Sequence, residues 1–471
     1  MNEDWRSPED NGVEEVLSSV GVDRRIPESI RWIFFVLGAA ILLPWCAIIT
    51  AMPYFRSRLE GSVLQSSFGS YLTVTFTVAN FCFLAHATVN TKNSNSARTT
   101  RRTLWIITVL NALFTLTTFT VLSPTLFFFF VILNGILQAT AGSYLQSAVM
   151  AVASLFGPTT IQSIMSGQAA IGVLVSLIQV LSAVASVKTG GQVVQAEDDE
   201  AATRAAFLFF GVSTLFMVLA VILHSWLLTI PAYKVVVIPY ESMKGVIGQA
   251  EEREGLVGHS RNVSQSASIK GSKKNHILEV AKLNIEYNFA VAYTFIITLA
   301  VFPAITSSIT SVHVPPTSLF TRPLLFIALH FLIFNVGDLI GRYLPLIPRL
   351  QVWSSRPLLY LSLARTLFIP AFLACNVGGS SNSPADSIVI KSDMMFFLIL
   401  LIFSVTNGYL GSIIMMTAPS PQHNKRLEHR PEDVDIAATI AQFCLVGGLV
   451  IGSFVSFGVS ALICSCNPFV Q

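Results

Sequence analysis

Charged residues are scarce in this chain: Asp, Glu, Lys and Arg make up 12% of its 471 residues, apolar residues make up 53%, and the mean hydropathy is +0.65. This scarcity excludes an ordinary soluble domain, in which about 25% of residues are charged. The alternating polar and apolar strands of an outer-membrane barrel are also missing, which excludes that architecture. The net charge of +3 reflects lysines and arginines in loops and requires no nucleic-acid partner. The composition therefore indicates a helical protein that crosses the lipid bilayer many times.

Catalytic and metal-binding patterns are missing as well. The chain has no His-Glu-x-x-His motif and no serine in a glycine-flanked elbow, and it lacks the paired intramembrane groups that an intramembrane enzyme needs. Its six cysteines lie within or at the ends of apolar segments without metal-type spacing, so we interpret them as packing residues. We expect no enzyme activity, no metal and no cofactor. No cleavable signal peptide is evident, so the first apolar run is expected to act as the signal.

Eleven apolar runs are long enough to cross a bilayer as helices, which takes about 20 residues each. Helices are expected because lipid cannot satisfy backbone hydrogen bonds. The runs cover residues 32–55, 68–90, 104–122, 125–156, 162–187, 205–230, 287–311, 322–344, 357–376, 393–419 and 436–465. A polar segment after the sixth run divides them into six and five. We therefore predict an all-α polytopic membrane protein with a 6+5 arrangement and a two-bundle fold like that of major-facilitator carriers.

Lysines and arginines are distributed unequally between the two ends of the predicted helices. With a cytoplasmic N-terminal tail, 21 of the 29 lie on the cytoplasmic side and five on the other, and this bias predicts that orientation. An odd number of helices then places the C-terminus outside or in a lumen. We expect four parts: a cytoplasmic tail (1–31), a six-helix bundle (32–230), a flexible cytoplasmic linker (231–286) and a five-helix bundle (287–471).

Asp338 is the one acidic side chain well inside an apolar run. An ionisable group in hydrocarbon costs about 2.5 to 3.5 kcal/mol, so it usually faces water, a partner or a solute. At helical spacing Asn335, Asp338 and Arg342 share one face. We predict a functional polar site on this face. The alternatives are a structural ion pair and an Arg342 side chain that reaches the headgroups.

A second polar region is predicted in the runs 125–156 and 162–187. One helical stripe carries small residues followed by an amide, namely Gly135, Ala139, Gly142 and Gln146. For the glycines we favour a packing role, because small residues let helices approach closely. Further amides in this pair of runs are Gln162, Gln168 and Gln179. Amides donate and accept hydrogen bonds, so this region indicates recognition of a neutral polar solute.

These residues belong to a larger set that resembles the equilibrative nucleoside transporters, in particular fungal members of that family. The set comprises Leu43-Pro44-Trp45, Tyr54-Phe55, Gln146, Met165-Ser166-Gly167-Gln168, Phe334-Asn335, Asp338, Gly341-Arg342, Arg365, Cys375-Asn376, Asn407-Gly408-Tyr409-Leu410 and Ala418-Pro419. Each motif is weak alone, but their order over nearly the whole chain makes the resemblance specific. The predicted eleven-helix plan with a cytoplasmic N-terminus also agrees with the family.

The resemblance implies a carrier of nucleosides, with nucleobases as further substrates, that works by alternating access through a central polar cavity. It assigns Trp45 to the cavity wall against the nucleobase, and Gln146 to the base edges. Asp338 and Arg342 are suited to ribose hydroxyls, with Asn335 supporting them. For Trp45 the alternative is the interfacial aromatic belt. Structural or gating roles are implied for Pro44, Gly142, Gln168, Arg365 and Asn407.

Some expectations carry alternatives. Arg365 lies mid-run and is expected to pair with an acid or with carbonyls, and His330 is expected to be a packing group.

Cys46 stands where most of the family carries Asn, so the ranking of substrates does not transfer. Proton coupling is an alternative driving force, but Arg342 argues against it because a neighbouring positive charge favours the carboxylate form of Asp338.

The alternative function is a proton-coupled major-facilitator carrier of another small polar solute. Such chains usually bear a Gly-Asp-Arg-type motif in the second connection, and here residues 91–98 lack it. The membrane is expected to be vacuolar or another endomembrane, with the plasma membrane as the alternative.

Overall fold

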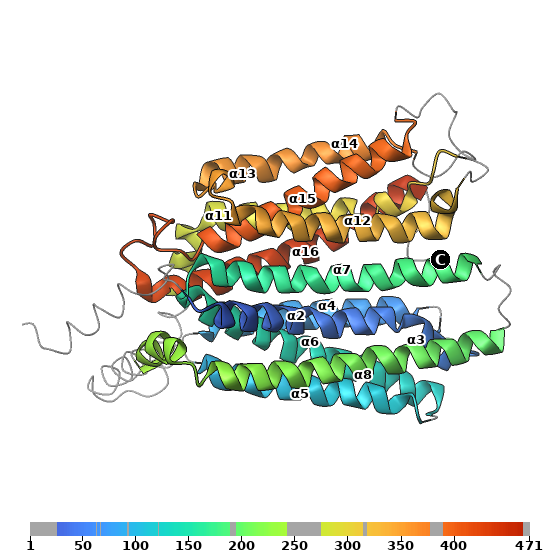
Figure 1. Cartoon of the computed structure of the whole chain (residues 1–471), viewed down its shortest axis with the longest axis horizontal. Coiled ribbons are helices and arrows are strands. Elements are labelled where there is room, and N and C mark those ends of the chain that lie inside the picture. Colours follow the sequence, from blue (N-terminus) through green and yellow to red (C-terminus); the bar gives the residue numbers. More distant parts are fainter. Residues whose placement is uncertain are drawn as a thin grey trace, which may run out of the picture.

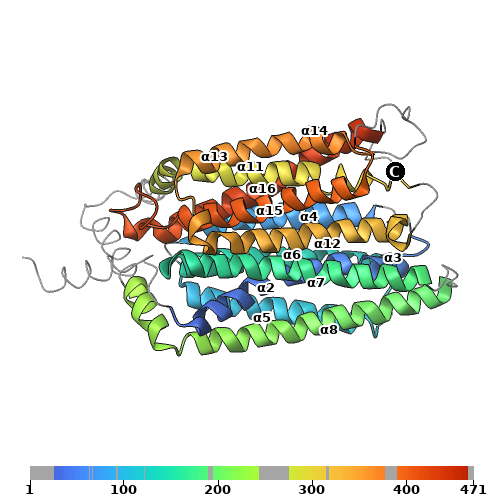
Figure 2. The ribbon, with the colours of Figure 1, turned by 45° about the horizontal axis from the view of Figure 1, so that its top comes forward.

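The computed structural model describes residues 26–62, 64–65, 67–91, 94–120, 122–188, 195–242, 275–313, 318–376 and 390–464. Long helices run side by side along the long axis of the molecule (Figure 1). Helices from the first half of the chain, in blue to green, gather on one side, and those from the second half, in yellow to red, gather on the other. In the turned view α7 and α12 lie next to each other, where the two groups meet (Figure 2).

The N-terminal bundle consists of α2 (Glu28–Thr50), α3 (Met52–Arg58), α4 (Phe68–Val89), α5 (Ser96–Thr117), α6 (Pro124–Leu155), α7 (Pro158–Lys188) and α8 (Gln195–Leu227). Proline begins α6 and α7, at a position where its missing N–H costs no helical hydrogen bond. The side chain of Asn95 accepts a hydrogen bond from the Arg98 N–H at 2.8 Å and caps α5. α2 packs against α7 and α8, α4 against α6, and α5 against α6 and α8.

The C-terminal bundle consists of α11 (Ile285–Val301), α12 (Pro323–Tyr343), α13 (Ser355–Ala364), α14 (Phe368–Leu373), α15 (Asp393–Thr417) and α16 (Val434–Cys464). Short 3-10 turns lie at Thr306–Ser308, Leu319–Thr321, Leu344–Leu346, Pro348–Leu350, Arg365–Leu367 and Pro431–Asp433. α11 packs against α16, α13 and α15, and α12 packs against α15. The two bundles meet where α12 and α15 contact α7 and where α16 contacts α4 and α6.

Nine of the described helices are long and apolar enough to cross a membrane. The two other predicted spans, 104–122 and 357–376, are also helical but differ from the prediction. α5 begins at Ser96, before the predicted start at 104, and its first turns carry arginines. The predicted span 357–376 is interrupted by the 3-10 turn Arg365–Leu367, because Pro370 has no N–H for the Thr366 carbonyl. Among the described residues, the structure therefore shows an all-helical membrane protein in which nine of the eleven predicted runs meet the length and hydropathy of a span.

Two of the predicted boundaries that differ from the structure do so at prolines. α11 ends at Val301 rather than at 311, since Phe302 precedes Pro303 and takes an extended conformation (φ −111°, ψ 124°). The first run, 32–55, is divided at Ala51, and Pro53 lies in the first turn of α3. Proline sets these boundaries because it restricts the residue before it and cannot donate to a preceding turn.

The segment 231–286, predicted as a flexible linker, is helical at both of its described ends, residues 231–242 and 275–283. Tyr233, Val237, Tyr240 and Val280 are buried there. Tyr233, Val237 and Tyr240 have the spacing of one apolar face of a helix, which is enough to dock a short helix onto a neighbouring surface. Residues 243–274 of the predicted linker and 1–25 of the predicted tail lie outside the described residues.

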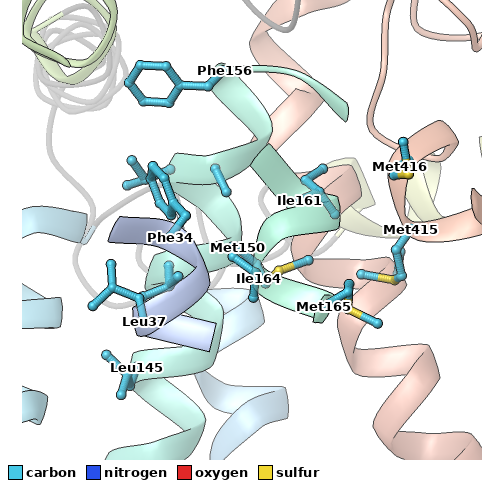
Figure 3. Close-up of a cluster of buried hydrophobic side chains, with 14 of the residues drawn as sticks. Phe34, Leu37, Leu145, Met150, Phe156, Ile161, Ile164, Met165, Met415 and Met416 are labelled. Carbon is cyan, nitrogen blue, oxygen red and sulfur yellow. The ribbon is translucent and has the colours of Figure 1, made fainter. Parts of the chain in front are cut away.

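The largest apolar core joins both bundles at the end of the molecule where α2 begins, which we call the near end. Phe34 of α2, Met150 of α6 and Ile161 of α7 lie in this core together with Met415 and Met416 of α15 (Figure 3). Phe81 of α4 and Phe443 of α16 stack across the same seam, with ring centroids 5.0 Å apart. The near end is therefore sealed between the bundles.

At the opposite, far end each bundle has its own core. One contains Phe55, Phe114 and Phe127 of the N-terminal bundle, and the other contains Phe334, Phe372 and Phe403 of the C-terminal bundle, among further residues. Among the described residues, a small cluster of Ala183, Leu325 and Ala328 joins α7 to α12 there. The contact between bundles is thus much more extensive at the near end than at the far end.

Candidate functional site

Asp338 and Arg342 form a buried ion pair on α12. Arg342 Nε donates to Asp338 Oδ2 at 2.8 Å, and the residues are only 6% and 7% exposed. The residues are four apart, so their side chains meet on one helix face. The Arg342 side chain stays within the protein instead of extending to the surface. The alternative in which the Arg342 side chain reaches the headgroups is therefore not adopted.

The pair is connected to both bundles. The second carboxylate oxygen, Asp338 Oδ1, accepts from Asn407 Nδ2 of α15 at 2.6 Å. Arg342 Nη1 donates to the Met165 carbonyl of α7 at 2.9 Å. Gln162 Nε2, also on α7, donates to the Arg342 carbonyl at 3.1 Å. Arg342 is thus the point at which the C-terminal bundle is hydrogen-bonded to the N-terminal bundle beside the charged pair.

A polar chain continues from Asp338 into the C-terminal bundle. Asn407 Oδ1 lies 2.7 Å from Thr298 Oγ1 of α11, and Arg365 Nη2 donates to that hydroxyl at 3.0 Å. Arg365 Nη1 also donates to the Phe403 carbonyl at 2.9 Å, and the guanidinium lies 4.4 Å from the Phe403 ring centroid. Arg365 is 1% exposed, and its partners are carbonyl and hydroxyl oxygens. It contacts Asp338 only indirectly, through hydrogen bonds by way of Thr298 and Asn407.

Glycines bring α12 and α15 close enough for this network. An ideal Cβ on Gly408 would lie 1.9 Å from the Asp338 carbonyl oxygen, and one on Gly341 would lie 2.2 Å from the Val405 carbonyl oxygen. Both distances are far below van der Waals contact, so only glycine fits at this backbone separation. The close approach sets the short bond between Asn407 and Asp338.

The charged pair lines a cavity of about 500 Å³ at the seam between the bundles. Its polar lining includes Gln138, Gln146, Gln168, Asn335, Asp338, Arg342 and Asn407. Trp45 stacks on Phe76 with ring centroids 4.1 Å apart, and Phe302 stacks on Phe334 at 3.8 Å. All four rings line the cavity. The cavity therefore combines an ion pair, several amides and two aromatic walls, which suits a flat polar solute.

Most of the residues predicted from sequence meet at this cavity. Besides the residues above, Pro44 and Gly142 line it. Asn335 Nδ2 donates to the Phe331 carbonyl at 2.9 Å, which leaves its oxygen to face Gly172 of α7. Arg365 lies behind the wall rather than on it, in contact with Thr298, which does line the cavity.

Two polar residues considered from sequence lie elsewhere. Gln179 is exposed on the outer surface of α7, in contrast to Gln168. His330 is 1% exposed, with Nδ1 2.9 Å from the Ile327 carbonyl and Nε2 3.1 Å from Thr306 Oγ1, which is the satisfied packing position expected for it.

Sequence reasoning missed Phe76, Thr298, Phe302 and Gln138 as cavity residues. The first three carry no sequence signal, since Phe and Thr are common in apolar helices. Gln138 had one, because it precedes Gly142 and Gln146 at intervals of four on α6 and so lies on the same stripe.

The chain is similar in sequence to known membrane transporters. A profile of the family described as nucleoside transporter matches residues 132–461. Equilibrative nucleoside transporter 1 of Rattus norvegicus is 27% identical, over 92% of this chain and 96% of the relative. Nucleoside transporter FUN26 of Saccharomyces cerevisiae is 25% identical, over 90% of this chain and 82% of the relative.

Among solved structures, the fucose:proton symporter FucP of E. coli, a major facilitator superfamily transporter, superimposes with a TM-score of 0.54 at 12% identity. The superposition covers 94% of this chain and 93% of the symporter. At that identity the likeness concerns the fold alone. It agrees with the predicted two-bundle architecture.

Proposed function

Because this chain belongs to the equilibrative nucleoside transporter family, we propose that it carries nucleosides across a membrane by alternating access through the central cavity. It is a multi-pass membrane carrier and not an enzyme. The observation that carries the proposal is the Asp338–Arg342 pair, which lines a cavity at the seam of two bundles and is hydrogen-bonded to both. A charged pair in this place can bind a solute and respond when the bundles move.

The proposed roles follow from the chemistry of each wall. Asp338 accepts from ribose hydroxyls and Arg342 donates to them, since charge-assisted bonds are the strongest available to a neutral sugar. Asn335 supports the pair from the preceding turn of α12. The stacked Trp45 and Phe76 rings provide a flat apolar face for the nucleobase, and Gln146 provides a donor and an acceptor for its edge.

Five further residues are proposed to hold or gate the site. Asn407 positions the Asp338 carboxylate, and Arg365 supports Asn407 through Thr298 of α11. Pro44 and Gly142 shape the cavity wall, and Gln168 of α7 lies at the seam where the bundles move.

The sealed near end and the separate far-end cores support an alternating-access cycle in which this conformation is closed towards the near side. We propose eleven spans in a 6+5 arrangement, with the N-terminus in the cytoplasm and the C-terminus outside or in a lumen. The near end, where α2 begins, is then cytoplasmic. We propose that the protein resides in the vacuolar membrane or another endomembrane, and fluorescence microscopy of a tagged chain would separate this from the plasma membrane.

Transport assays with purified protein in liposomes test the proposed function. Uridine and adenosine uptake should exceed uptake of a sugar of similar size, with uracil measured as the nucleobase. An inward proton gradient should not stimulate uptake, because the relatives that this chain matches are named as equilibrative transporters. Sugar uptake without nucleoside uptake, driven by the gradient, would instead favour a proton-coupled carrier of another solute.

The near-end seal includes a hydrogen bond that should affect the conformational equilibrium. Tyr240, after α8, donates to Asp435 Oδ1 of α16 at 2.9 Å and is 2% exposed. Burial and the neighbouring Asp435 carboxylate raise the pKa of Tyr240 well above its usual value, so the hydroxyl keeps its proton at neutral pH. A hydrogen bond to a charged group is worth about 1.5 kcal/mol or more. Tyr240→Phe should therefore shift the population about tenfold towards the state open at the near end.

Thiol labelling measures this shift. Met416→Cys, placed in a chain without other cysteines, puts a thiol in the near-end core, where Met416 is 2% exposed. Tyr240→Phe should accelerate labelling about tenfold. Tyr360→Phe is the matched control, since Tyr360 is 68% exposed. Equal labelling rates in the two variants would show that Tyr240 does not hold the near end closed.

A further inference from the structure

The charges buried around the cavity do not balance. Asp338 is the one acidic side chain well inside an apolar run, whereas two guanidinium groups, those of Arg342 and Arg365, are buried in its neighbourhood. A guanidinium group keeps its charge in proteins, so both arginines are cations. Arg342 takes the carboxylate directly, through the bond from Nε to Oδ2. The charge of Arg365 therefore has no carboxylate of its own among the described residues of the interior.

Hydrogen bonds connect Arg365 to the same carboxylate. The guanidinium can only donate, so Thr298 Oγ1 accepts from Nη2 at 3.0 Å. That hydroxyl lies 2.7 Å from Asn407 Oδ1, an acceptor, and 2.7 Å from the Thr294 carbonyl. Asn407 Nδ2 then donates to Asp338 Oδ1 at 2.6 Å. Both cations thus draw on one carboxylate, Arg342 by contact and Arg365 through two neutral side chains.

The remaining surroundings of Arg365 are neutral. Nη1 donates to the Phe403 carbonyl at 2.9 Å and to Thr406 Oγ1 at 2.6 Å, and the guanidinium lies over the Phe403 ring. Nε has no hydrogen-bond partner among the described residues. Carbonyl oxygens and a ring face stabilise a cation without cancelling its charge. A charged group held within a membrane in this way is costly, so it usually has a function.

The excess charge lies close to the solute cavity. Thr298 and Asn407 line the cavity, and Arg365 is one hydrogen bond behind Thr298. Arg342 lines it as well. The surrounding protein and lipid have a low dielectric constant, so a charge behind the wall is screened much less than in water. These groups together make the cavity electropositive.

We propose that Arg365 determines specificity for solute charge: it makes the central cavity electropositive, so that the carrier accepts neutral nucleosides and rejects positively charged ones. The inference rests on the proposed nucleoside transport and adds the charge of the substrate to it. Arg365 does not touch the solute and acts through the electric field in the cavity. A structural role alone would affect neutral and cationic solutes of the same shape equally.

The test compares two competitors of uridine uptake in liposomes at neutral pH. 1-Methyladenosine is a cation under these conditions, and 1-methylinosine has nearly the same shape without the charge. Wild-type protein should bind 1-methylinosine about tenfold more tightly or better, since two unit charges about 10 Å apart at an effective dielectric constant of about 20 interact by that amount. In Arg365→Gln the two inhibition constants should agree within about threefold. Arg365→Met should behave in the same way and serves if the glutamine variant does not fold.

Thr406→Val is the matched control, because it removes an acceptor of Arg365 Nη1 and leaves the charge in place. Thr406 is not among the residues that line the cavity. Its preference for 1-methylinosine should equal that of wild type. Equal inhibition constants in wild type would overturn the proposal without reference to any variant, as would a preference retained in both Arg365 variants or lost in Thr406→Val. Wild-type protein that transports no nucleoside would instead overturn the proposed function itself.

Discussion

Replacing Asp338 by alanine is expected to reduce nucleoside uptake to below about 1% of wild type in liposomes. The carboxylate offers charge-assisted hydrogen bonds to ribose, each worth about 1.5 to 3 kcal/mol, and two of them amount to a hundredfold or more in affinity. The substitution also removes the acceptor of Arg342 Nε and Asn407 Nδ2. Breaking one partner of a buried ion pair costs a further 3 to 5 kcal/mol or so in stability.

A double variant separates binding from folding. Asp338→Asn combined with Arg342→Gln leaves no unpaired charge in the interior and keeps hydrogen-bonding groups at both positions. We expect it to insert with a thermal midpoint close to that of wild type, yet to remain inactive. Asp393→Asn is the matched control, because Asp393 accepts from Ser311 Oγ and the Val312 N–H away from the cavity. Recovery of uptake in the double variant would show that the ion pair is structural.

Gly408→Ala is expected to cause the largest loss among conservative substitutions in the C-terminal bundle. The added Cβ would lie 1.9 Å from the Asp338 carbonyl oxygen and 3.0 Å from the Arg342 nitrogen, so α12 and α15 would have to separate. Overpacking of this kind costs about 1 to 3 kcal/mol and occasionally more. The separation also lengthens the 2.6 Å bond from Asn407 to Asp338, and we expect uptake to fall at least about tenfold.

Gly211→Ala in α8 provides the comparison. No heavy atom lies within 4 Å of an ideal Cβ at Gly211, and alanine is a better helix former by about 1 kcal/mol. Its thermal midpoint in detergent should equal or exceed that of wild type, with normal uptake, while the midpoint of Gly408→Ala should fall. Equal midpoints and equal uptake in the two alanine variants would contradict the close approach of α12 and α15.

Local spacing was enough to predict part of the site. Asn335, Asp338 and Arg342 share one helix face whatever surrounds the helix, and a carboxylate within an apolar run already requires a polar partner or water. The length and apolarity of the runs likewise identified most membrane-spanning helices. The predicted runs 287–311 and 32–55 were wrong as single helices, since the structure ends the first at Val301 and divides the second at Ala51, next to prolines that the runs include.

The partners of these groups depend on how distant segments pack, and periodicity within one helix does not encode them. Asn407 meets Asp338, and the Met165 carbonyl meets Arg342, because glycines and helix crossings bring α12 against α15 and α7. Gln168 lies at the cavity while Gln179 of the same helix is exposed, a difference set by the position of α7 between the bundles. The chain thus specified its membrane class and one polar helix face by itself. Helix packing decided which partners the polar groups of that face bind and which of these groups line the cavity.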